Sequence, residues 1–232
     1  MKHELDRPTP TVEDYLQEIY DQRRDGKTVI AARLAERGGV SAPTAWATLQ
    51  RMQRDGLVEL RNRHDIHLTE RGKEAAESIK RRHYLTERLL VDILGMDWAA
   101  AHEEAHRIEH AVSPQVEVRI MALLGNPTTC PHGNVFPGLP RPATVLLSTL
   151  REGDEAEIDG VQEEAEEDAD LMRFLQQNGM TPGTRIRVVE FASFNSTMTI
   201  EVEGQRVVFG LPAAESLRVL ERSLAKVGPA TA

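Results

Sequence analysis

The pattern of apolar residues in one stretch predicts the fold of the N-terminal part of the chain. This stretch is residues 28–69, "TVIAARLAERGGVSAPTAWATLQRMQRDGLVELRNRHDIHLT". Its apolar residues first recur at helical spacing and then alternate, which predicts a helix, a turn, a second helix and two short strands. Ala45, Leu49 and Met52 would form the buried face of the second helix. This order of elements is typical of a winged helix, a fold that binds DNA.

The second of these helices is predicted to begin after Ser41 and to end near Asp55. Ser41 suits the N-cap and Pro43 the first turn. A recognition helix of this kind enters the major groove by its N-terminal end, and the wing contacts the DNA backbone. The residues expected to face DNA are Ser41, Pro43, Thr44, Thr48 and Arg51 on the helix, with Arg61 and Arg63 on the wing. The alternative is a small helical domain with ordinary surface arginines.

The composition indicates a soluble, cytoplasmic protein. No apolar run in the 232 residues approaches the roughly 20 residues that cross a bilayer, so no membrane partner is expected. The stretch "MKHELDRPTP" lacks the apolar core of a secretion signal. A single cysteine, Cys130, excludes an internal disulfide and fits a reducing compartment.

Charge is distributed unevenly along the chain, whose formal net charge is -9. Residues 151–170 carry eleven acidic residues and one basic residue, whereas residues 28–67 carry six arginines and four acidic residues. A local basic surface can bind DNA even when the whole protein is acidic. The N-terminal half is therefore the better candidate for a polyanionic partner.

A proline-rich linker divides the chain. Residues 126–142, "NPTTCPHGNVFPGLPRP", contain five prolines and two glycines, so they cannot form a helix or a central strand. Before the linker the apolar spacing is helical. After it, "TRIRVVEF", "TMTIEVE" and "QRVVFG" have the pattern of β-strands. We expect a mainly α-helical N-terminal half followed by a small β-rich domain.

The stretch "WAAAHEEAHRIEHAV", residues 98–112, suggests a metal site. On a helix, four of its side chains stand at i, i+4, i+7 and i+8 and share one face. They are His102, His106, Glu109 and His110. The preceding helix adds His83 and Glu87 at i, i+4. A buried carboxylate with imidazoles needs a partner, and a divalent ion supplies one.

Other interpretations of these histidines stay open. A lone histidine on a helix is more often structural than a ligand, and His83 with Glu87 could be an exposed i, i+4 pair. A metalloenzyme would need an open metal position and a general base, and the chain has neither an HExxH motif nor another catalytic signature. We therefore expect no enzyme activity and no small organic substrate.

In sequence, the chain resembles the diphtheria toxin repressor family of metal-dependent transcriptional regulators, in its long form with a C-terminal SH3-like (FeoA-like) domain. The matching motifs, in order, are "TVEDYLQEIY", "SAPTAWATLQRMQRDGLV", "LTERGKEAA", "RRHYLTERLLVDILG", "HEEAHRIEHAVS" and "CPHGNVFPG". "LSTLREGDEAEI" and "MTPGTRIRVVE" extend the match. The resemblance implies a winged helix-turn-helix domain at 1–73, a helical metal-binding and dimerisation domain with the linker at 74–142, and an SH3-like barrel at 143–232.

The resemblance implies a primary metal site built from Asp14, His106, Glu109 and His110. Members that respond to iron typically carry methionine at the position of Asp14 and cysteine at that of His106. The oxygen and nitrogen donors found here suit manganese as well as iron. Mn(II) is therefore expected first and Fe(II) next, with Co, Ni, Zn or Cd able to substitute in vitro. Gln17, where manganese-type members commonly have a second glutamate, is a further candidate ligand.

An ancillary metal site is also implied, with ligands at His83, Glu87 and His102. The family usually completes this site with a side chain from the SH3-like domain. We expect Asp168 in this role, with Glu164 as second choice.

The function implied is a Mn(II)-activated repressor of metal-uptake genes that controls manganese and iron homeostasis. It would bind an inverted-repeat operator in double-stranded DNA as a homodimer. The alternatives are an Fe(II)-responsive regulator of the same family, a winged-helix regulator with another signal and, third, a metalloenzyme.

Overall fold

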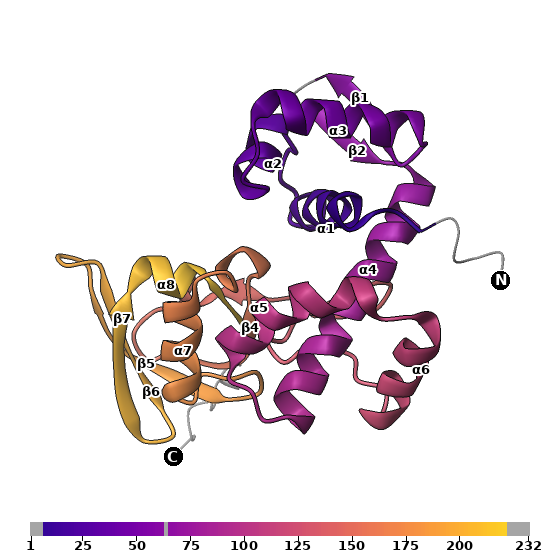
Figure 1. Ribbon diagram of the computed structural model, residues 1–232. Coiled ribbons are helices and arrows are strands. Elements are labelled where there is room, and N and C mark those ends of the chain that lie inside the picture. The colour runs from indigo at the N-terminus through magenta and orange to yellow at the C-terminus, as the bar shows by residue number, and fades with distance from the viewer. Residues whose placement is uncertain (1–6, 63–64, 222–232) are drawn as a thin grey trace, which may run out of the picture. The chain divides into compact units, whose positions relative to one another are not determined.

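The computed structural model describes residues 7–62 and 65–221 and divides into two compact units (Figure 1). The first unit comprises the chain up to His83 together with Arg107–Glu117. The second comprises Tyr84–His106 and the chain from Val118 onward. Among the described residues, no helix combines the length and the apolar character that a membrane crossing requires. The division into three domains at residues 73 and 142 stays a prediction.

The first unit contains the expected helix, turn, helix and hairpin. Its elements are α1 (Pro10–Arg24), α2 (Ala31–Arg37), α3 (Ala42–Arg54), β1 (Val58–Asn62), β2 (Asp65–Leu68) and the first part of α4 (Glu70–Arg88). The two strands pair antiparallel, with Leu60 opposite Ile66. The prediction of a winged helix is therefore confirmed.

The core of the first unit joins α1 to α3. Leu16 and Ile19 of α1 and Leu49 and Met52 of α3 are fully buried in one apolar cluster. Burial of each such side chain stabilises the fold by about 1.5–3 kcal/mol. Because α1 and α3 share this core, the position of one helix fixes that of the other.

Helix α3 begins where the sequence predicts. The Ser41 hydroxyl oxygen accepts a hydrogen bond from the backbone N–H of Thr44 at 3.3 Å, and a proline occupies the first turn. The cap satisfies one of the backbone donors that every helix leaves open at its start. Ala42, Pro43 and Thr44 at the start of the helix are exposed, and Ala45 is the first buried residue.

The helical segments that follow are short. Helix α4 continues into a π-helical turn, η2 (Leu89–Ile93). It is followed by α5 (Trp98–Ile108), the 3-10 turn η3 (Glu109–Ala111) and α6 (Pro114–Leu123). The change from α5 to η3 tightens the chain at Glu109 and His110, so these two side chains stand at a helix end.

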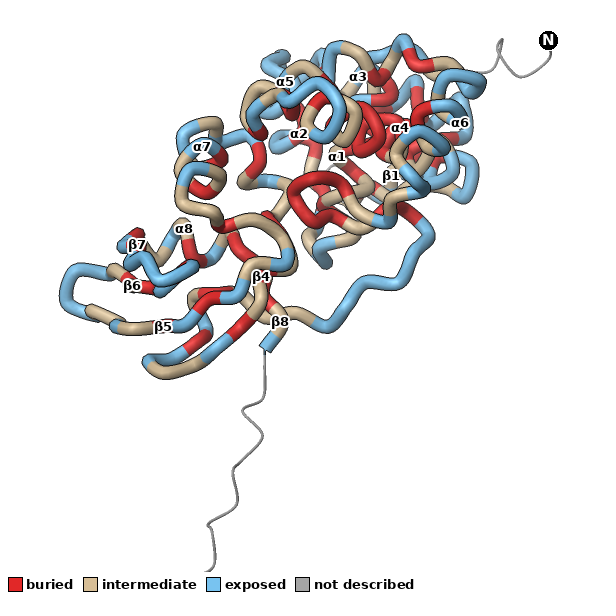
Figure 2. The backbone as a smooth tube through the Cα atoms, turned by 90° about the horizontal axis from the view of Figure 1, so that it is seen from below, coloured by how far each residue is buried: buried red, intermediate tan, exposed pale blue. Residues whose placement is uncertain are grey.

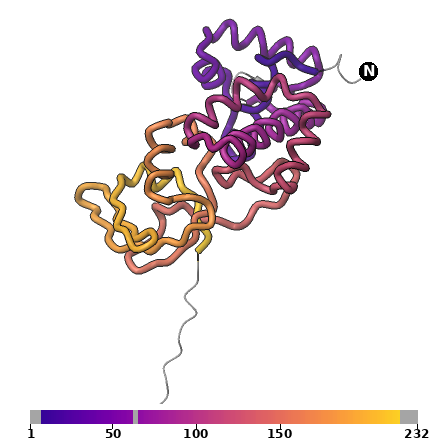
Figure 3. The backbone as a smooth tube through the Cα atoms, turned by 60° about the horizontal axis from the view of Figure 1, so that its bottom comes forward, coloured from indigo at the N-terminus to yellow at the C-terminus, as the bar shows by residue number. Residues whose placement is uncertain are grey.

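After the linker, the second unit forms a six-stranded antiparallel sheet in the order β3-β8-β4-β5-β6-β7, orange to yellow in Figure 3. The strands are β3 (Val145–Leu146), β4 (Glu155–Val161), β5 (Arg185–Ala192), β6 (Thr197–Val202), β7 (Gln205–Gly210) and β8 (Leu217–Glu221). The other elements are η4 (Leu147–Thr149), η5 (Glu163–Ala165), α7 (Ala169–Gln177) and α8 (Leu211–Glu215). Buried residues alternate with half-buried or exposed ones along β6, and Figure 2 colours the backbone of this sheet by burial. The three predicted strands are confirmed as β5, β6 and β7.

The acidic run at 151–170, for which we predicted no element, contains β4, η5 and the beginning of α7. Ala156, Ile158 and Val161 of β4 are buried in the apolar core of the sheet. Acidic residues stand between these apolar residues, so the overall composition of the segment does not reveal the alternation. This acidic segment forms a central strand because Ala156 and Ile158 fall on one face, and the irregularity between Ile158 and Gly160 lets Val161 join the same core.

The linker is packed rather than extended at residues 130–134, which are buried. Two glycines allow this loop to lie directly against β4. A Cβ atom on Gly160 would lie 2.5 Å from the carbonyl oxygen of His132, and one on Gly133 would lie 2.0 Å from that of Asp159. Gly133 also has a φ of +89°, a conformation that other residues rarely adopt.

We predict that Gly133→Ala lowers the free energy of unfolding by at least about 1–3 kcal/mol, because it adds backbone strain and overlap with β4. Chemical denaturation followed by circular dichroism measures the loss. Gly138→Ala is the matched control, since Gly138 has a φ of +85° but open space around its Cβ position. Equal losses in the two variants would contradict close packing at Gly133.

Candidate metal centres and nucleic-acid interface

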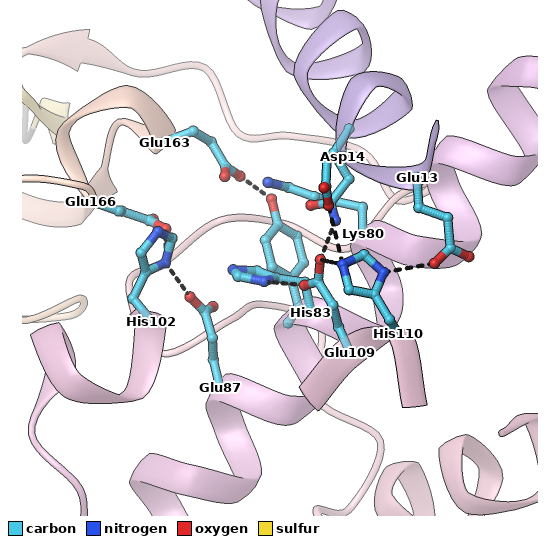
Figure 4. Close-up of polar contacts among 12 residues, drawn as sticks. Glu13, Asp14, Lys80, His83, Glu87, His102, Glu109, His110, Glu163 and Glu166 are labelled. Carbon is cyan, nitrogen blue, oxygen red and sulfur yellow. Dashed lines mark hydrogen bonds and ion pairs between the residues drawn. The ribbon is translucent and has the colours of Figure 1, made fainter. Parts of the chain in front are cut away.

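The first unit brings together three of the predicted primary ligands. Asp14 lies on α1, and Glu109 and His110 lie on η3. Their donor atoms are within 4.8 Å of one another. The Nε2 atom of His110 is 3.1 Å from Asp14 Oδ1 and 3.6 Å from Glu109 Oε1 (Figure 4). Two distant segments of the chain therefore present oxygen and nitrogen donors to one point.

Glu109 is fully buried, and its neighbours orient it. Its Oε1 atom accepts a hydrogen bond from Gln17 Nε2 at 2.5 Å, and its Oε2 atom lies 2.5 Å from His83 Nδ1. Gln17 thus contacts the cluster through its amide nitrogen rather than as an oxygen donor. His83, expected in the ancillary set, contacts a predicted primary ligand within the first unit.

The carboxylates of Asp14, Glu109 and Glu13 lie close together, so a nearby positive charge would stabilise their ionised forms. The Asp14 side chain is 57% exposed, but partial desolvation by its neighbours raises the pKa of its carboxyl above the ordinary value; His110 opposes the rise, and the charges of Glu109 and Glu13 add to it. A like charge nearby disfavours the ionised form of a carboxyl, and a cation favours it. The donor set therefore fits a divalent ion on both charge and chemistry.

A second cluster lies within the second unit. It is formed by Glu87 of α4, His102 of α5, His132 of the linker and Glu166, which follows η5; all four are buried, with donor atoms within 4.8 Å of one another. The Nδ1 atom of His102 is 2.8 Å from Glu87 Oε1 and 3.4 Å from Glu166 Oε2. Figure 4 shows Glu87 and Glu166 on either side of His102.

His132 and Glu166 are the two members of this cluster that were not predicted from the sequence. The first of them is an imidazole from the linker. Its Nδ1 atom lies 3.4 Å from carboxylate oxygens of both Glu87 and Glu166, yet neither ring nitrogen makes a hydrogen bond within the described residues. Burial alone would lower the pKa of His132, but the two carboxylates outweigh it and raise the pKa well above its ordinary value. The raised pKa favours a protonated His132, whose positive charge balances Glu87 and Glu166. A bound cation would balance the same two carboxylates.

Cys130 lies close to this cluster and is buried. Burial raises the pKa of its thiol to about 12, and the charges of Glu87 and Glu166 contribute. A thiol with this pKa is protonated at neutral pH, and a thiol is a poor metal ligand compared with a thiolate. This geometry favours a structural role for Cys130 over a role as a metal ligand.

The structure corrects our choice of ligand from the C-terminal domain. Asp168 is exposed, and its Oδ1 atom accepts hydrogen bonds from the backbone N–H groups of Asp170 (3.1 Å) and Leu171 (3.0 Å) as the N-cap of α7. Glu164 is also exposed. Glu166 occupies the cluster instead, because the turn η5 directs this one carboxylate of the acidic run inward.

The neighbours of Glu166 hold its carboxylate in place. Asn134 donates a hydrogen bond from Nδ2 to Glu166 Oε1, and Arg218 donates from Nη2 to Asn134 Oδ1 at 2.9 Å. The bond from Arg218 fixes which end of the amide faces the carboxylate. Glu166 Oε2 is left facing His102 and His132.

His106 lies in the second unit. Its ring stacks edge-to-face on that of His102, with ring centroids 4.8 Å apart. Its assignment to the primary site stays a prediction.

The predicted DNA-contacting side chains lie on the outer surface of α3 and the hairpin. Ser41, Pro43, Thr44, Arg51 and Arg61 are exposed, and Thr48 is half-buried. Arg63, predicted on the wing, lies outside the described residues. The exposed hydroxyls at the start of α3 and the exposed arginines fit a helix that meets DNA by its N-terminal end.

Three family descriptions match consecutive parts of the chain. Residues 8–65 match "Iron dependent repressor, N-terminal DNA binding domain", and residues 69–138 match "Iron dependent repressor, metal binding and dimerisation domain". Residues 145–220 match "FeoA domain".

The chain is 40% identical over 191 residues to the iron-dependent repressor IdeR of Mycobacterium tuberculosis, covering 77% of this chain and 83% of the relative. It is 43% identical over 129 residues to the diphtheria toxin repressor of Corynebacterium diphtheriae, covering 56% of this chain and 57% of the relative. The chain belongs to the diphtheria toxin repressor family. As a member of this family, it is a metal-dependent, DNA-binding transcriptional repressor rather than an enzyme.

A solved structure described as a manganese-dependent transcriptional repressor in complex with manganese superimposes on this repressor with a TM-score of 0.82. The two are 33% identical, and the superposition covers 91% of this chain and all of the other. The predicted family and fold class are therefore confirmed. The chain is thus similar both to a repressor described as iron-dependent and to one described as manganese-dependent.

The corrected ligand choice predicts different effects for two neighbouring carboxylates. Glu166→Gln should weaken metal binding at the second cluster by at least about tenfold, because a charged donor is lost. Asp168→Asn should leave affinity within about twofold, since asparagine also caps helices well. Competition with a chromophoric chelator measures both affinities. A larger loss in Asp168→Asn than in Glu166→Gln would restore the assignment made from sequence.

Metal binding to the second cluster should release about one proton near neutral pH, because His132 must lose the proton that its raised pKa retains. Affinity should therefore fall as the pH is lowered. Calorimetry at pH 7 in buffers of different ionisation enthalpy counts the protons. His132→Gln should reduce the number released; an unchanged number would contradict this role of His132.

Proposed function

We propose that this repressor is activated by Mn(II), binds an inverted-repeat operator as a homodimer and represses metal-uptake genes. Fe(II) is the alternative activator. The observation that carries the proposal is the convergence of Asp14 from α1 with Glu109 and His110 from η3. This donor set contains oxygen and nitrogen only. Repression by DNA binding requires the protein to work in the compartment that holds the DNA, which we take to be the cytoplasm.

The donor set joins the winged helix to the metal-binding domain. Asp14 lies on α1, whose apolar face shares a core with the recognition helix α3. When bound, a divalent ion supplies the positive charge that holds the Asp14 carboxylate against Glu109 and His110. These side chains thereby fix α1, and with it α3, relative to η3. The gain in DNA affinity equals the preference of the ion for the DNA-competent arrangement.

The choice of Mn(II) rests on the ligand types. Sulfur donors favour softer metals, whereas carboxylate and imidazole suit manganese and iron. Asp14 and Glu109 are carboxylates, His110 is an imidazole, and we assign His106 to the same site as a further nitrogen donor. Co, Ni, Zn and Cd, which bind similar donors, are expected to substitute in vitro.

The second cluster serves as an ancillary site in this proposal. Glu87, His102, His132 and Glu166 supply two carboxylates and two imidazoles from helices α4 and α5, the linker and the C-terminal domain. An ion held by all four would tie the sheet to the helical part of the second unit. The C-terminal domain thus acts by stabilising the metal-bound form.

Exposed apolar residues support a homodimer. Ile93 and Leu94 at the end of the α4–η2 segment are 51% and 63% exposed, and Leu123 at the end of α6 is 61% exposed. The match to a dimerisation domain covers these positions. Burial of such residues against a second copy would favour association. A dimer with two-fold symmetry presents two recognition helices to half-sites about 34 Å, or a multiple of this distance, apart on B-DNA.

Side chains on α3 and the hairpin would contact the operator. Thr44, Thr48 and Arg51 would meet base edges and phosphates in the major groove, beside Ser41 and Pro43 at the start of the helix. Arg61 and Arg63 would contact the backbone through the wing. Phosphate contacts make this binding salt-dependent.

The proposed switch is tested with a pool of random duplexes at fixed salt. Metal-free protein should select no sequence, and protein with Mn(II) should select one inverted repeat. Fe(II) and Zn(II) added separately rank the metals. Metal-dependent DNA affinity should fall at least about tenfold in Glu109→Gln, because the site loses a charged ligand.

Glu103→Gln is the matched control for this experiment. Glu103 is exposed on α5, and its substitution removes the same charge as Glu109→Gln. It should bind DNA like the unaltered protein. Equal selection with and without metal would overturn the switch, and the histidine-rich segment would then be structural. Stronger selection with Fe(II) than with Mn(II) would reverse the proposed metal preference.

A further inference from the structure

Glu13, next to Asp14 on α1, is an almost fully buried carboxylate with 2% of its surface exposed. Its Oε1 atom accepts hydrogen bonds from Arg7 Nε at 2.8 Å and from Arg82 Nη2 at 2.7 Å. Its Oε2 atom lies 2.7 Å from Nδ1 of His110. One side chain thus meets three basic groups from different segments of the first unit.

The His110 ring lies between this carboxylate and the donor cluster (Figure 4). Its Nδ1 atom faces Glu13, and its Nε2 atom faces Asp14 Oδ1 at 3.1 Å. A neutral imidazole carries one proton and one lone pair, so the nitrogen that donates a hydrogen bond leaves the other free to bind a metal. The orientation of the ring therefore matches the needs of a ligand.

We propose that Glu13 is the positioning residue of the primary metal site: it accepts the Nδ1 proton of His110 and thereby directs the Nε2 lone pair toward Asp14 and Glu109. This inference rests on the proposed metal site and deepens it. A carboxylate behind a metal-bound histidine fixes the tautomer and the ring orientation and makes the imidazole a better donor.

Two arginines hold the Glu13 carboxylate in the position that this role requires. Guanidinium groups stay protonated in proteins, so Arg7 and Arg82 provide permanent positive charge beside the carboxylate. Arg82 is itself buried, at 5% exposure, and its bond to Glu13 gives its charge a partner. Glu13 is therefore held as an acceptor directed at His110, a contact that an amide in its place would make more weakly.

Arg7 extends this arrangement to the backbone of the ligand-bearing turn. Its Nη2 atom donates to the carbonyl oxygen of Glu109 and its Nη1 atom to that of Val112, both at 3.3 Å. These carbonyls lie at and just beyond η3, and that of Glu109 also accepts a hydrogen bond from the backbone N–H of Val112 at 3.4 Å. The segment before α1 is thus joined through Glu13 to the turn that carries Glu109 and His110.

The first test uses the unaltered protein, so its result does not depend on the folding of a variant. Nitrogen-15 NMR of the histidine rings in metal-free protein, at a pH where imidazoles are neutral, distinguishes the two tautomers. The signal absent from His110→Gln identifies His110. We expect its proton on Nδ1. A proton on Nε2 would overturn the proposal.

The second test compares Glu13→Gln with Glu18→Gln. In the first variant, the amide accepts the Nδ1 proton more weakly and can donate to Nδ1 instead, so we expect His110 to lose its tautomer preference. Metal affinity at this site should fall about 10- to 100-fold. Glu18 lies on the same helix, and its carboxylate pairs with Arg37 at 2.8 Å, so its substitution should change neither readout.

Occupancy of the site is followed by the loss of the assigned His110 signal as Mn(II), which is paramagnetic, is added stepwise. If this signal does not respond to metal in the unaltered protein, the metal site itself is refuted. If it responds, and Glu13→Gln matches the unaltered protein in tautomer and affinity, only the role of Glu13 is refuted. A variant that merely lost stability would shift its unfolding midpoint without changing the His110 tautomer.

Discussion

The need of buried carboxylates for a positive partner governs this structure. Glu13 and Glu109 in the first unit, and Glu87 and Glu166 in the second, are each at most 2% exposed. Removing an ionised carboxylate from water without a partner costs more than the few kcal/mol by which a typical fold is stable. The chain meets this need with guanidinium and imidazole groups. The same need, in the places where several carboxylates converge, produces a site suited to a divalent ion.

The two clusters orient their donors by different means. In the first unit, side chains contact the ligands directly: Glu13 contacts His110, and His83 contacts Glu109. In the second unit, Asn134 holds Glu166 through a hydrogen bond that uses one carboxylate oxygen and leaves the other directed at the cluster. In both places the supporting residue decides which atom of the ligand remains available. Metal affinity therefore depends on side chains that never contact the ion.

The carboxylate clusters also explain why this fold suits regulation. A protein whose donor set is held partly by protons, as at His132, binds a metal in exchange for those protons. The first cluster spans two chain segments, one of which carries the winged-helix core through Leu16 and Ile19. A ligand that favours one arrangement of those segments shifts the population toward it. Local charge balance is thereby coupled to the placement of a DNA-binding helix.

Much of the fold could be predicted because its signals are local. The spacing of Leu49 and Met52 predicted the buried face of α3, and Ser41 predicted where that helix begins. The apolar alternation after the linker predicted β5, β6 and β7. The strand β4 was missed, since its apolar residues are interleaved with the acidic residues that dominate the composition of that segment.

The pattern of helices and strands was readable from sequence, and family resemblance paired Asp14 with Glu109 and His110. The single ligand face expected for residues 102–110 is divided, because the helix ends at Ile108 and His102 joins the second cluster while Glu109 and His110 join the first. Tertiary contacts place His132 and Glu166, rather than Asp168, in the second cluster. The reason is physical: these positions depend on how the linker packs against β4. That packing requires the absence of a side chain at Gly133 and Gly160, and such close contacts between distant segments leave no periodic signal in a sequence.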